Sequence, residues 1–312
     1  MQGFFFYLIM ADKKKVIIIA GPTAVGKTAV AIHLALQLGT EIISADSRQC
    51  YRELKIGVAR PSDEELKMVP HHFIATHSIH QKLTAASFED YALQKTSELF
   101  QDHDTIVMVG GTGLYIKAFC EGLDPIPEVP EEIRNQIIAE YEEKGLEWLQ
   151  QEVLLADPEF YKVAEVSNPH RLMRALEVIK ATGRPILDYR KGHKAQRDFE
   201  VIKIALELPR EILHAQINKR VDQMMSMGLL DEVRSLFSFR HLNALQTVGY
   251  KELFNYLERK TSLDEAVDEI KKNTRQYAKR QMTWFKKDLS YRWFSPDAAY
   301  NLGENLLTNL HL

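Results

Sequence analysis

Short runs of β-branched and other apolar residues recur along the first third of the chain. They read "VIIIA" at 16–20, "EIIS" at 41–44 and "TIVMVGG" at 105–111. Continuous apolar runs of this length are typical of strands buried on both faces of a parallel sheet. A similar run, "FEVIKIALELP" at 199–209, returns much later. These runs predict the strands of one sheet.

Helical patterns separate the first three runs. One spans residues 27 to about 38, and another spans 87–100, with Ser87 as its expected N-cap and acids in its first turn. Strands alternating with helices predict an α/β fold with a P-loop-type, doubly wound parallel sheet. Ligands of such folds bind at the carboxyl ends of the strands. Three polar candidates fall there: Lys27, Asp46 and Thr112.

The character of the chain changes after residue 122. Pro125, Pro127 and Pro130 interrupt regular structure, and residues 131–183 are charged and helical without a β-rich run. Long helical patterns fill most of the chain after residue 209. We therefore expect a catalytic core of residues 1–122 and 199–312, with C-terminal helices, and an all-helical insertion lobe of residues 123–198.

Net charge, cysteine content and the apolar first residues limit the classes of protein to which this chain can belong. The 312 residues carry a formal net charge of −3, so any nucleic-acid surface must be a local patch. With only Cys50 and Cys120, a disulfide framework and a four-cysteine zinc site are excluded, which fits a reducing cytosol. The apolar start, "MQGFFFYLIM", is short and no basic segment precedes it. We expect a packed extension or a start at Met10, and a cytoplasmic protein without a membrane segment.

The stretch "GPTAVGKT", residues 21–28, has the spacing G-x-x-x-x-G-K-[ST] of a phosphate-binding loop. Its glycines let backbone N–H groups approach phosphate oxygens, Lys27 adds a positive charge, and Thr28 can hold Mg²⁺. The expected strand before it and helix after it support this interpretation. The loop alone leaves open whether it holds a nucleoside triphosphate or a diphosphate leaving group.

A second polar segment follows the expected strand at 41–44. Asp46 is followed by Ser47, Arg48 and Gln49. Three roles are open for Asp46: a magnesium ligand, a general base, and an N-cap of the following turn. After the next strand, the glycines of "VGGTGLY" allow close backbone approach, and Thr112 offers a hydroxyl to the same crevice.

Four further stretches accompany these motifs: "VPHHFI", "HRLMRALEV", "VGYKE" and "NTRQYAKRQMTWFKK". The whole set occurs in the order found in bacterial tRNA dimethylallyltransferases. The chain resembles this family from residue 16 to about 294. The resemblance implies Mg²⁺-dependent transfer of a dimethylallyl group from dimethylallyl diphosphate to the exocyclic amine of the adenosine just 3′ of the tRNA anticodon. The catalytic residues would be Asp46 as general base, Thr112 and Arg220. Sequence alone favours a solvated position for Arg220.

The resemblance also implies which residues bind the substrates. The diphosphate site would comprise Gly21, Pro22, Thr23, Ala24, Val25, Gly26, Lys27 and Thr28, with Thr28 at the metal. Residues contacting tRNA would be Asp46, Ser47, Arg48, Gln49, Thr112, Arg134, His170, Arg171, Leu172, Met173, Arg174, Gln246, Thr247, Val248, Gly249, Tyr250 and Lys251. In this set, residues 46–49 would read a flipped-out adenosine and Tyr250 would stack on a base. The helical lobe would grip the anticodon arm of a tRNA bound to a monomer.

The strongest local charge lies at residues 271–287, which contain seven basic residues and no acid. Tyr277, Gln281, Trp284 and Phe285 recur there at helical spacing. Aromatic stripes are usually buried, and such charges are usually solvated. We expect the aromatic side chains to pack on the core and the cations to face RNA phosphates, which makes binding salt-dependent.

Two other functions share part of this pattern. A small-molecule P-loop kinase would use the same loop and acid and consume ATP, but it leaves the helical insertion and the basic aromatic helix unexplained. An RNA-binding module that uses nucleotide as a switch would leave Asp46 unexplained. Val58 and Arg60 stand where many members of the resembled family have Thr and Lys, which puts fine contacts in doubt.

Overall fold

The computed structural model describes residues 13–192 and 194–298. Contacts divide the chain into two compact units, of which one is Glu121–Ala195 and the other comprises the chain on either side of it. The insertion expected at 123–198 overlaps the smaller unit. The expectation for the apolar residues 1–10 lies outside the described residues.

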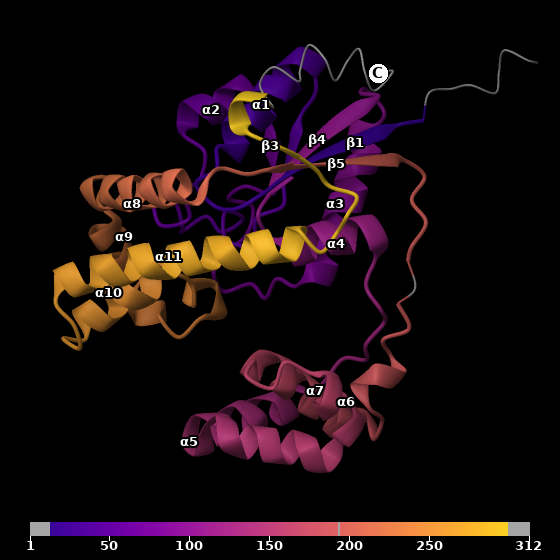
Figure 1. Cartoon of the computed structure of the whole chain (residues 1–312), viewed down its shortest axis with the longest axis vertical. Coiled ribbons are helices and arrows are strands. Elements are labelled where there is room, and N and C mark those ends of the chain that lie inside the picture. Colours follow the sequence, from indigo (N-terminus) through magenta and orange to yellow (C-terminus); the bar gives the residue numbers. More distant parts are fainter. Residues whose placement is uncertain (1–12, 193, 299–312) are drawn as a thin grey trace, which may run out of the picture. The chain divides into compact units, whose positions relative to one another are not determined.

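The larger unit is built on a six-stranded sheet in the order β3-β2-β4-β1-β5-β6, and every pairing is parallel (Figure 1). The α/β class with a parallel sheet is therefore confirmed. Two strands were not expected, because β3 and β6 are too short to show a hydrophobic period. The strands are β1 (Lys15–Ala20), β2 (Ile42–Ser44), β3 (His71–His72), β4 (Thr105–Gly110), β5 (Glu200–Leu206) and β6 (Arg292–Phe294).

Helices follow most strands of this unit. They are α1 (Lys27–Leu38), α2 (Asp63–Met68), α3 (Ala85–Leu99), α4 (Gly113–Glu121), α8 (Arg210–Ser226), α9 (Leu229–Ser235), α10 (Tyr250–Leu257) and α11 (Leu263–Phe285), with short 3₁₀ turns at Phe237–Phe239 and Asn243–Leu245. The expected N-cap at Ser87 is wrong. Thr84 caps α3, and its hydroxyl accepts from the Ser87 N–H while the Ser87 hydroxyl accepts from the Thr84 N–H. Such a reciprocal pair places Ser87 in the first turn.

Side chains of β1 point alternately into two hydrophobic cores. Val16, Ile18 and Ala20 pack in the core that includes α3 and α4, whereas Ile17 and Ile19 pack in the core that includes α1 and α8. Figure 1 shows α1 and α3 on opposite sides of the sheet. Full burial of each isoleucine contributes about 1.5–3 kcal/mol, which explains the unbroken apolar run.

The register of the sheet brings three loops together. Ala20 at the end of β1 pairs with Gly110 at the end of β4, and Ser44 at the end of β2 pairs with Val109. The phosphate loop, the segment from Asp46 and the segment from Gly111 therefore leave the same edge of the sheet.

The smaller unit is helical and has a core of its own. It contains α5 (Glu131–Ala156), interrupted at Gly145, then α6 (Pro158–Val163), α7 (Pro169–Thr182) and a 3₁₀ turn at Ile186–Asp188. Its fully buried side chains include Ile137, Leu149, Leu172 and Leu176. In neither unit does the described part of the chain contain a helix long and apolar enough to cross a membrane.

Candidate functional site

The phosphate loop forms part of the wall of a cavity of about 440 Å³. Five of its eight expected residues line this cavity: Thr23, Ala24, Gly26, Lys27 and Thr28. The other three support the loop. Gly21 has φ +142°, and a Cβ there would lie 2.7 Å from the Leu206 carbonyl oxygen; the Pro22 carbonyl accepts from Lys27 Nζ at 2.6 Å; and Val25 packs in the core.

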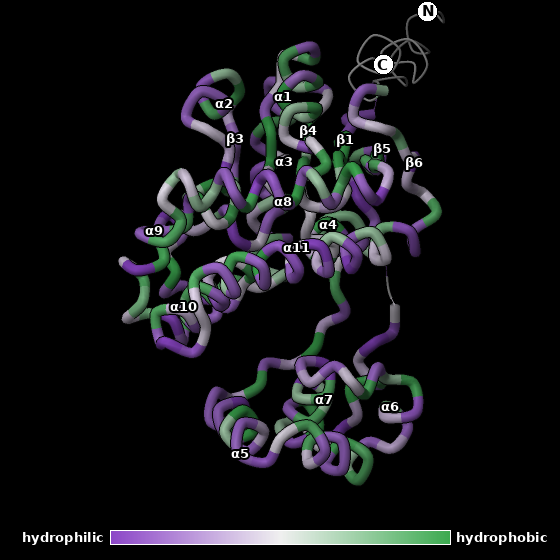
Figure 2. Tube along the Cα trace, turned by 60° about the vertical axis from the view of Figure 1, so that its left-hand side comes forward, coloured by the Kyte–Doolittle hydropathy of each residue, from purple (hydrophilic) through white to green (hydrophobic). Residues whose placement is uncertain are grey.

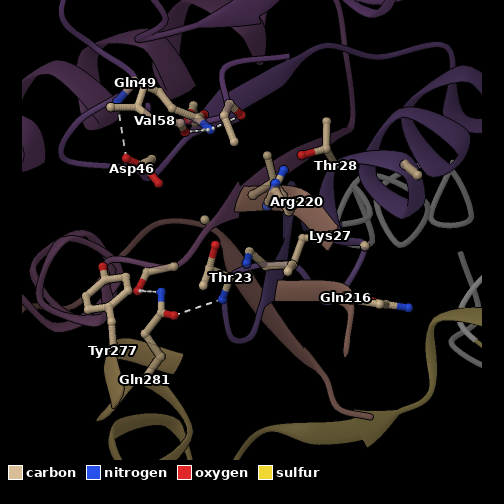
Figure 3. A pocket seen from close by; sticks show the side chains of 18 of the residues that line it. Thr23, Lys27, Thr28, Asp46, Gln49, Val58, Gln216, Arg220, Tyr277 and Gln281 are labelled. Atoms are coloured by element: carbon tan, nitrogen blue, oxygen red, sulfur yellow. Dashed lines mark hydrogen bonds between the residues drawn. The ribbon is translucent and has the colours of Figure 1, made fainter. Parts of the chain in front are cut away.

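Two cations from distant elements point into this cavity (Figure 3). Lys27 begins α1, and Arg220 lies in the second half of α8. Burial and the Arg220 charge lower the pKa of the Lys27 ammonium to about 7, against the opposing charge of Asp46. Burial also lowers the pKa of Arg220, which forms no hydrogen bond or ion pair with the described residues. Two mutually repelling cations favour a bound anion. The solvated position favoured for Arg220 by sequence alone is wrong.

The two carboxylate oxygens of Asp46 have different surroundings. Its Oδ1 accepts the backbone N–H groups of Arg48 at 2.8 Å and Gln49 at 3.2 Å. This is the turn-capping role that the sequence left open. Within the described ranges Oδ2 has no hydrogen-bond partner, and Asp46 lines the cavity opposite Lys27 and Arg220. One carboxylate thus caps a turn and keeps an acceptor oxygen available.

Thr112 supports the turn after Asp46. Its Oγ1 accepts from the Ser47 backbone N–H at 3.1 Å and donates to the Ser47 hydroxyl at 3.3 Å. Thr112 is absent from the lining of both cavities. The structure therefore brings Thr112 close to the Asp46 segment, but with its hydroxyl engaged by Ser47.

A second cavity of about 580 Å³ shares several wall residues with the first, among them Thr23, Asp46 and Arg220. Its wall adds residues expected to contact tRNA: Ser47, Arg48, Gln246, Thr247, Val248, Gly249 and Lys251. The base-stacking role expected for Tyr250 is wrong for this position. Its ring is fully buried, and its hydroxyl donates to Glu232 Oε1 at 2.6 Å.

Helix α11 contributes a residue whose role the sequence pattern did not reveal. Gln281, only 7% exposed, accepts the Thr23 backbone N–H at 2.8 Å and donates to the Gly111 carbonyl at 2.9 Å. It therefore ties the phosphate loop to the end of β4. A Cβ at Gly111 would lie 2.3 Å from Gln281 Nε2, so the glycine permits the contact. An amide in an otherwise aromatic stripe was the available signal.

The aromatic residues of α11 divide between core and surface. Phe285 is buried as expected, whereas Tyr277 and Trp284 keep more than a third of their surface exposed. Tyr277 lines both cavities, and the partial removal of its phenol from water there, together with the Asp46 charge, raises its pKa to about 12. Figure 2 shows hydrophobic and hydrophilic positions alternating along α11.

The remaining candidate residues lie in the helical unit. Arg134 and Arg174 both contact the buried Glu177 carboxylate, at 3.2 and 3.1 Å, and His170 and Arg171 are exposed. Leu172 and Met173 belong to the core of this unit. Their side chains therefore serve packing on this helical face, and their place in a tRNA-contacting segment stays a prediction.

Sequence comparison finds relatives that all belong to one enzyme family. The family model described as IPP transferase matches residues 49–288. The tRNA dimethylallyltransferase of Christiangramia forsetii is 51% identical over 279 residues, covering 89% of this chain and 92% of that protein. The tRNA dimethylallyltransferase 1 of Bacteroides thetaiotaomicron is 46% identical, covering 94% of this chain and 96% of that protein.

Solved structures agree in fold. The full-length tRNA isopentenylpyrophosphate transferase of Bacillus halodurans superimposes with a TM-score of 0.70 at 35% identity, over 96% of this chain and 97% of that one. A eukaryotic dimethylallyltransferase acting on tRNA gives a TM-score of 0.74 at 24% identity, over 95% of this chain and 77% of that one, which shows likeness of fold alone. The chain therefore belongs to the IPP transferase family of tRNA dimethylallyltransferases.

Proposed function

We propose that this protein transfers a dimethylallyl group from dimethylallyl diphosphate to the exocyclic amine of the adenosine 3′-adjacent to the anticodon in tRNA. The observation that supports this most directly is the pair of adjoining cavities that share Asp46 and Arg220. A cationic cavity beside a second, larger one suits two substrates that meet at a carboxylate.

The first cavity suits a diphosphate leaving group. As the bond between the allylic carbon and oxygen breaks, negative charge develops on the diphosphate oxygens. Lys27, Arg220 and the N–H groups at the start of α1 would stabilise that charge.

Asp46 is the proposed general base. The aromatic amine is a weak nucleophile, and it must lose a proton when the new carbon–nitrogen bond forms. Oδ2 would accept that proton, while Oδ1 stays hydrogen-bonded to the Arg48 and Gln49 backbone and holds the carboxylate in place.

The residues present fit a bound Mg²⁺. Mg²⁺ prefers oxygen ligands and usually binds through one or two protein oxygens together with substrate phosphates. The Thr28 hydroxyl and the Asp46 carboxylate line the same cavity as Lys27. Thr28 would hold the ion, which when bound supplies positive charge to the diphosphate oxygens.

The second cavity and the helical unit would bind tRNA. Arg48 and Lys251 in the cavity wall, together with Arg134, His170, Arg171 and Arg174 on the helical unit, offer cations and donors to phosphates. The protein would act as a monomer.

One incubation tests the proposed reaction. Purified protein, Mg²⁺ and unmodified tRNA are combined with either dimethylallyl diphosphate or ATP. The tRNA is then digested, and the masses of its nucleosides are measured by mass spectrometry. We expect a five-carbon unit on adenosine with the allylic diphosphate only. Phosphoryl transfer or ATP hydrolysis without a prenylated nucleoside would instead favour the kinase.

An isosteric variant tests the base. In Asp46→Asn the amide oxygen can still accept the Arg48 and Gln49 N–H groups, but the NH₂ group cannot accept a proton. We expect turnover to fall by about 10²–10⁴-fold with little change in tRNA affinity. Asp102→Asn, an exposed acid outside both cavities, is the matched control. Unchanged turnover in Asp46→Asn would remove Asp46 from this role.

A further inference from the structure

The Glu232 carboxylate on α9 holds a turn that lies about 175 residues earlier in the chain. Its Oε2 accepts the backbone N–H groups of Lys55 at 3.1 Å and Ile56 at 2.7 Å. Its Oε1 accepts the Gly57 N–H at 3.0 Å and the Tyr250 hydroxyl at 2.6 Å. Hydrogen bonds to a carboxylate are stronger than those between neutral groups, so this one side chain anchors the whole turn.

Tyr250 closes the turn from the other side. A Cβ on Gly57 would lie 2.6 Å from the Tyr250 ring, so the backbone of the turn packs directly against the buried ring. Within the turn, the Ala59 N–H donates to the Ile56 carbonyl at 2.9 Å. The position of residues 55–59 is thereby determined from both sides.

The end of this turn orients an amide in the first cavity. The Val58 and Ala59 carbonyls accept from Gln49 Nε2 at 3.2 and 3.0 Å. An amide nitrogen carries two hydrogens, so both are used. Among the residues that the structure describes, Gln49 Oε1 accepts a hydrogen bond only from the Ser44 hydroxyl, at 3.4 Å. Gln49 therefore offers the cavity an acceptor and no donor, near Asp46 (Figure 3).

We propose that Glu232 is a positioning residue for base recognition: by anchoring residues 55–57 it keeps the Gln49 amide oxygen toward the substrate. An acceptor at this place suits a purine with an amino group at position 6 and opposes one with a carbonyl there. Without the hydrogen bonds from Glu232, the Gln49 amide can flip and present its NH₂ group to the substrate. This inference rests on the proposed function.

The test compares two anticodon stem-loop RNAs that differ only in adenosine or inosine at the target position. The intact protein should bind the adenosine form about tenfold more tightly, the size expected for one well-oriented hydrogen bond. In Glu232→Gln, an NH₂ group replaces one accepting oxygen, and we expect the preference to fall below about twofold. The affinity for inorganic pyrophosphate with Mg²⁺ should be the same in Glu232→Gln as in the intact protein. Asp231→Asn, the exposed neighbouring acid, should retain the full preference.

Either equal binding of the two RNAs by the intact protein or a full preference in folded Glu232→Gln would overturn the proposal. Thermal unfolding shows whether that variant folds. If it does not, Tyr250→Phe removes only one of the four donors and should lower the preference partially; a full preference there would also overturn the proposal. Prenylation of the adenosine RNA by the intact protein is measured separately, so a failure of the proposed function is recognised independently.

Discussion

The pKa of the Lys27 ammonium is about 7, against an ordinary value of 10.5, so this group is close to its titration midpoint at neutral pH. Between these values the folded protein has lost a proton that the unfolded chain keeps, so this residue's contribution to the free energy of unfolding increases as pH rises from 7 to 10.5. A bound diphosphate would favour the charged ammonium. Binding above pH 7 must therefore take up a proton.

This proton uptake makes the binding of dimethylallyl diphosphate dependent on pH. Affinity for dimethylallyl diphosphate without tRNA should weaken between pH 7 and 9 by up to about tenfold per pH unit. Titration calorimetry in buffers of different ionisation enthalpy measures both the affinity and the protons taken up. Lys27→Arg keeps its charge over this range and should show a flatter profile. Equal slopes for the two proteins would contradict the prediction.

At the scale of elements, α11 links the phosphate loop that follows β1 to the segment that follows β4. Gln281→Met removes the amide that joins Thr23 to Gly111 and leaves a buried N–H and a carbonyl unpaired. We expect a loss of stability of about 1–3 kcal/mol and a raised KM for dimethylallyl diphosphate with the KM for tRNA nearly unchanged. Denaturant unfolding and steady-state kinetics check both; the same change at exposed Gln101 is the control. An effect confined to the KM for tRNA would count against a role at the phosphate loop.

Periodicity predicted the long elements and missed the short ones. The bounds of α1 agree with the expected 27–38, because the loop motif marks its start and Gly39 its end. β3 and β6 have two and three residues and join the sheet only through pairing with β2 and β5. No local pattern of that length distinguishes a strand from a loop.

At the scale of the molecule, the two units have separate cores, and the residues of both cavities lie in the larger one. Leu176 is 1% exposed in the helical core. Leu176→Ala should destabilise that unit by about 2–5 kcal/mol and weaken tRNA binding, while the affinity for dimethylallyl diphosphate stays the same. Hydrogen exchange resolved by segment and binding titrations measure these effects. A tenfold loss of diphosphate affinity would show that the units are coupled.

Arg174 of the helical unit is a candidate contact to a tRNA phosphate, and such a contact is sensitive to salt. Arg174→Gln removes one of two arginines on Glu177 and leaves Arg134 paired, so the buried carboxylate keeps a partner. If Arg174 meets a phosphate, the slope of log affinity for tRNA against log salt should decrease by about 1. Lys162→Gln, an exposed cation of the same unit paired with Glu159, is the control. Parallel salt plots for Arg174→Gln and the intact protein would exclude this contact.

Local sequence determined the phosphate loop, the strands beside it and the candidacy of Lys27 and Asp46. Each depends on spacing within a few residues and on the edge where parallel strands end. Tertiary structure alone decided that Gln281 and Glu232 hold backbone from more than a hundred residues away, and that Tyr250 is buried. By pattern Arg220 is an ordinary helical cation, and only the packing of α8 turns it into the cavity. The physical reason is that local pattern reports on neighbouring residues, whereas hydrogen-bond partners and burial depend on segments that meet only after folding.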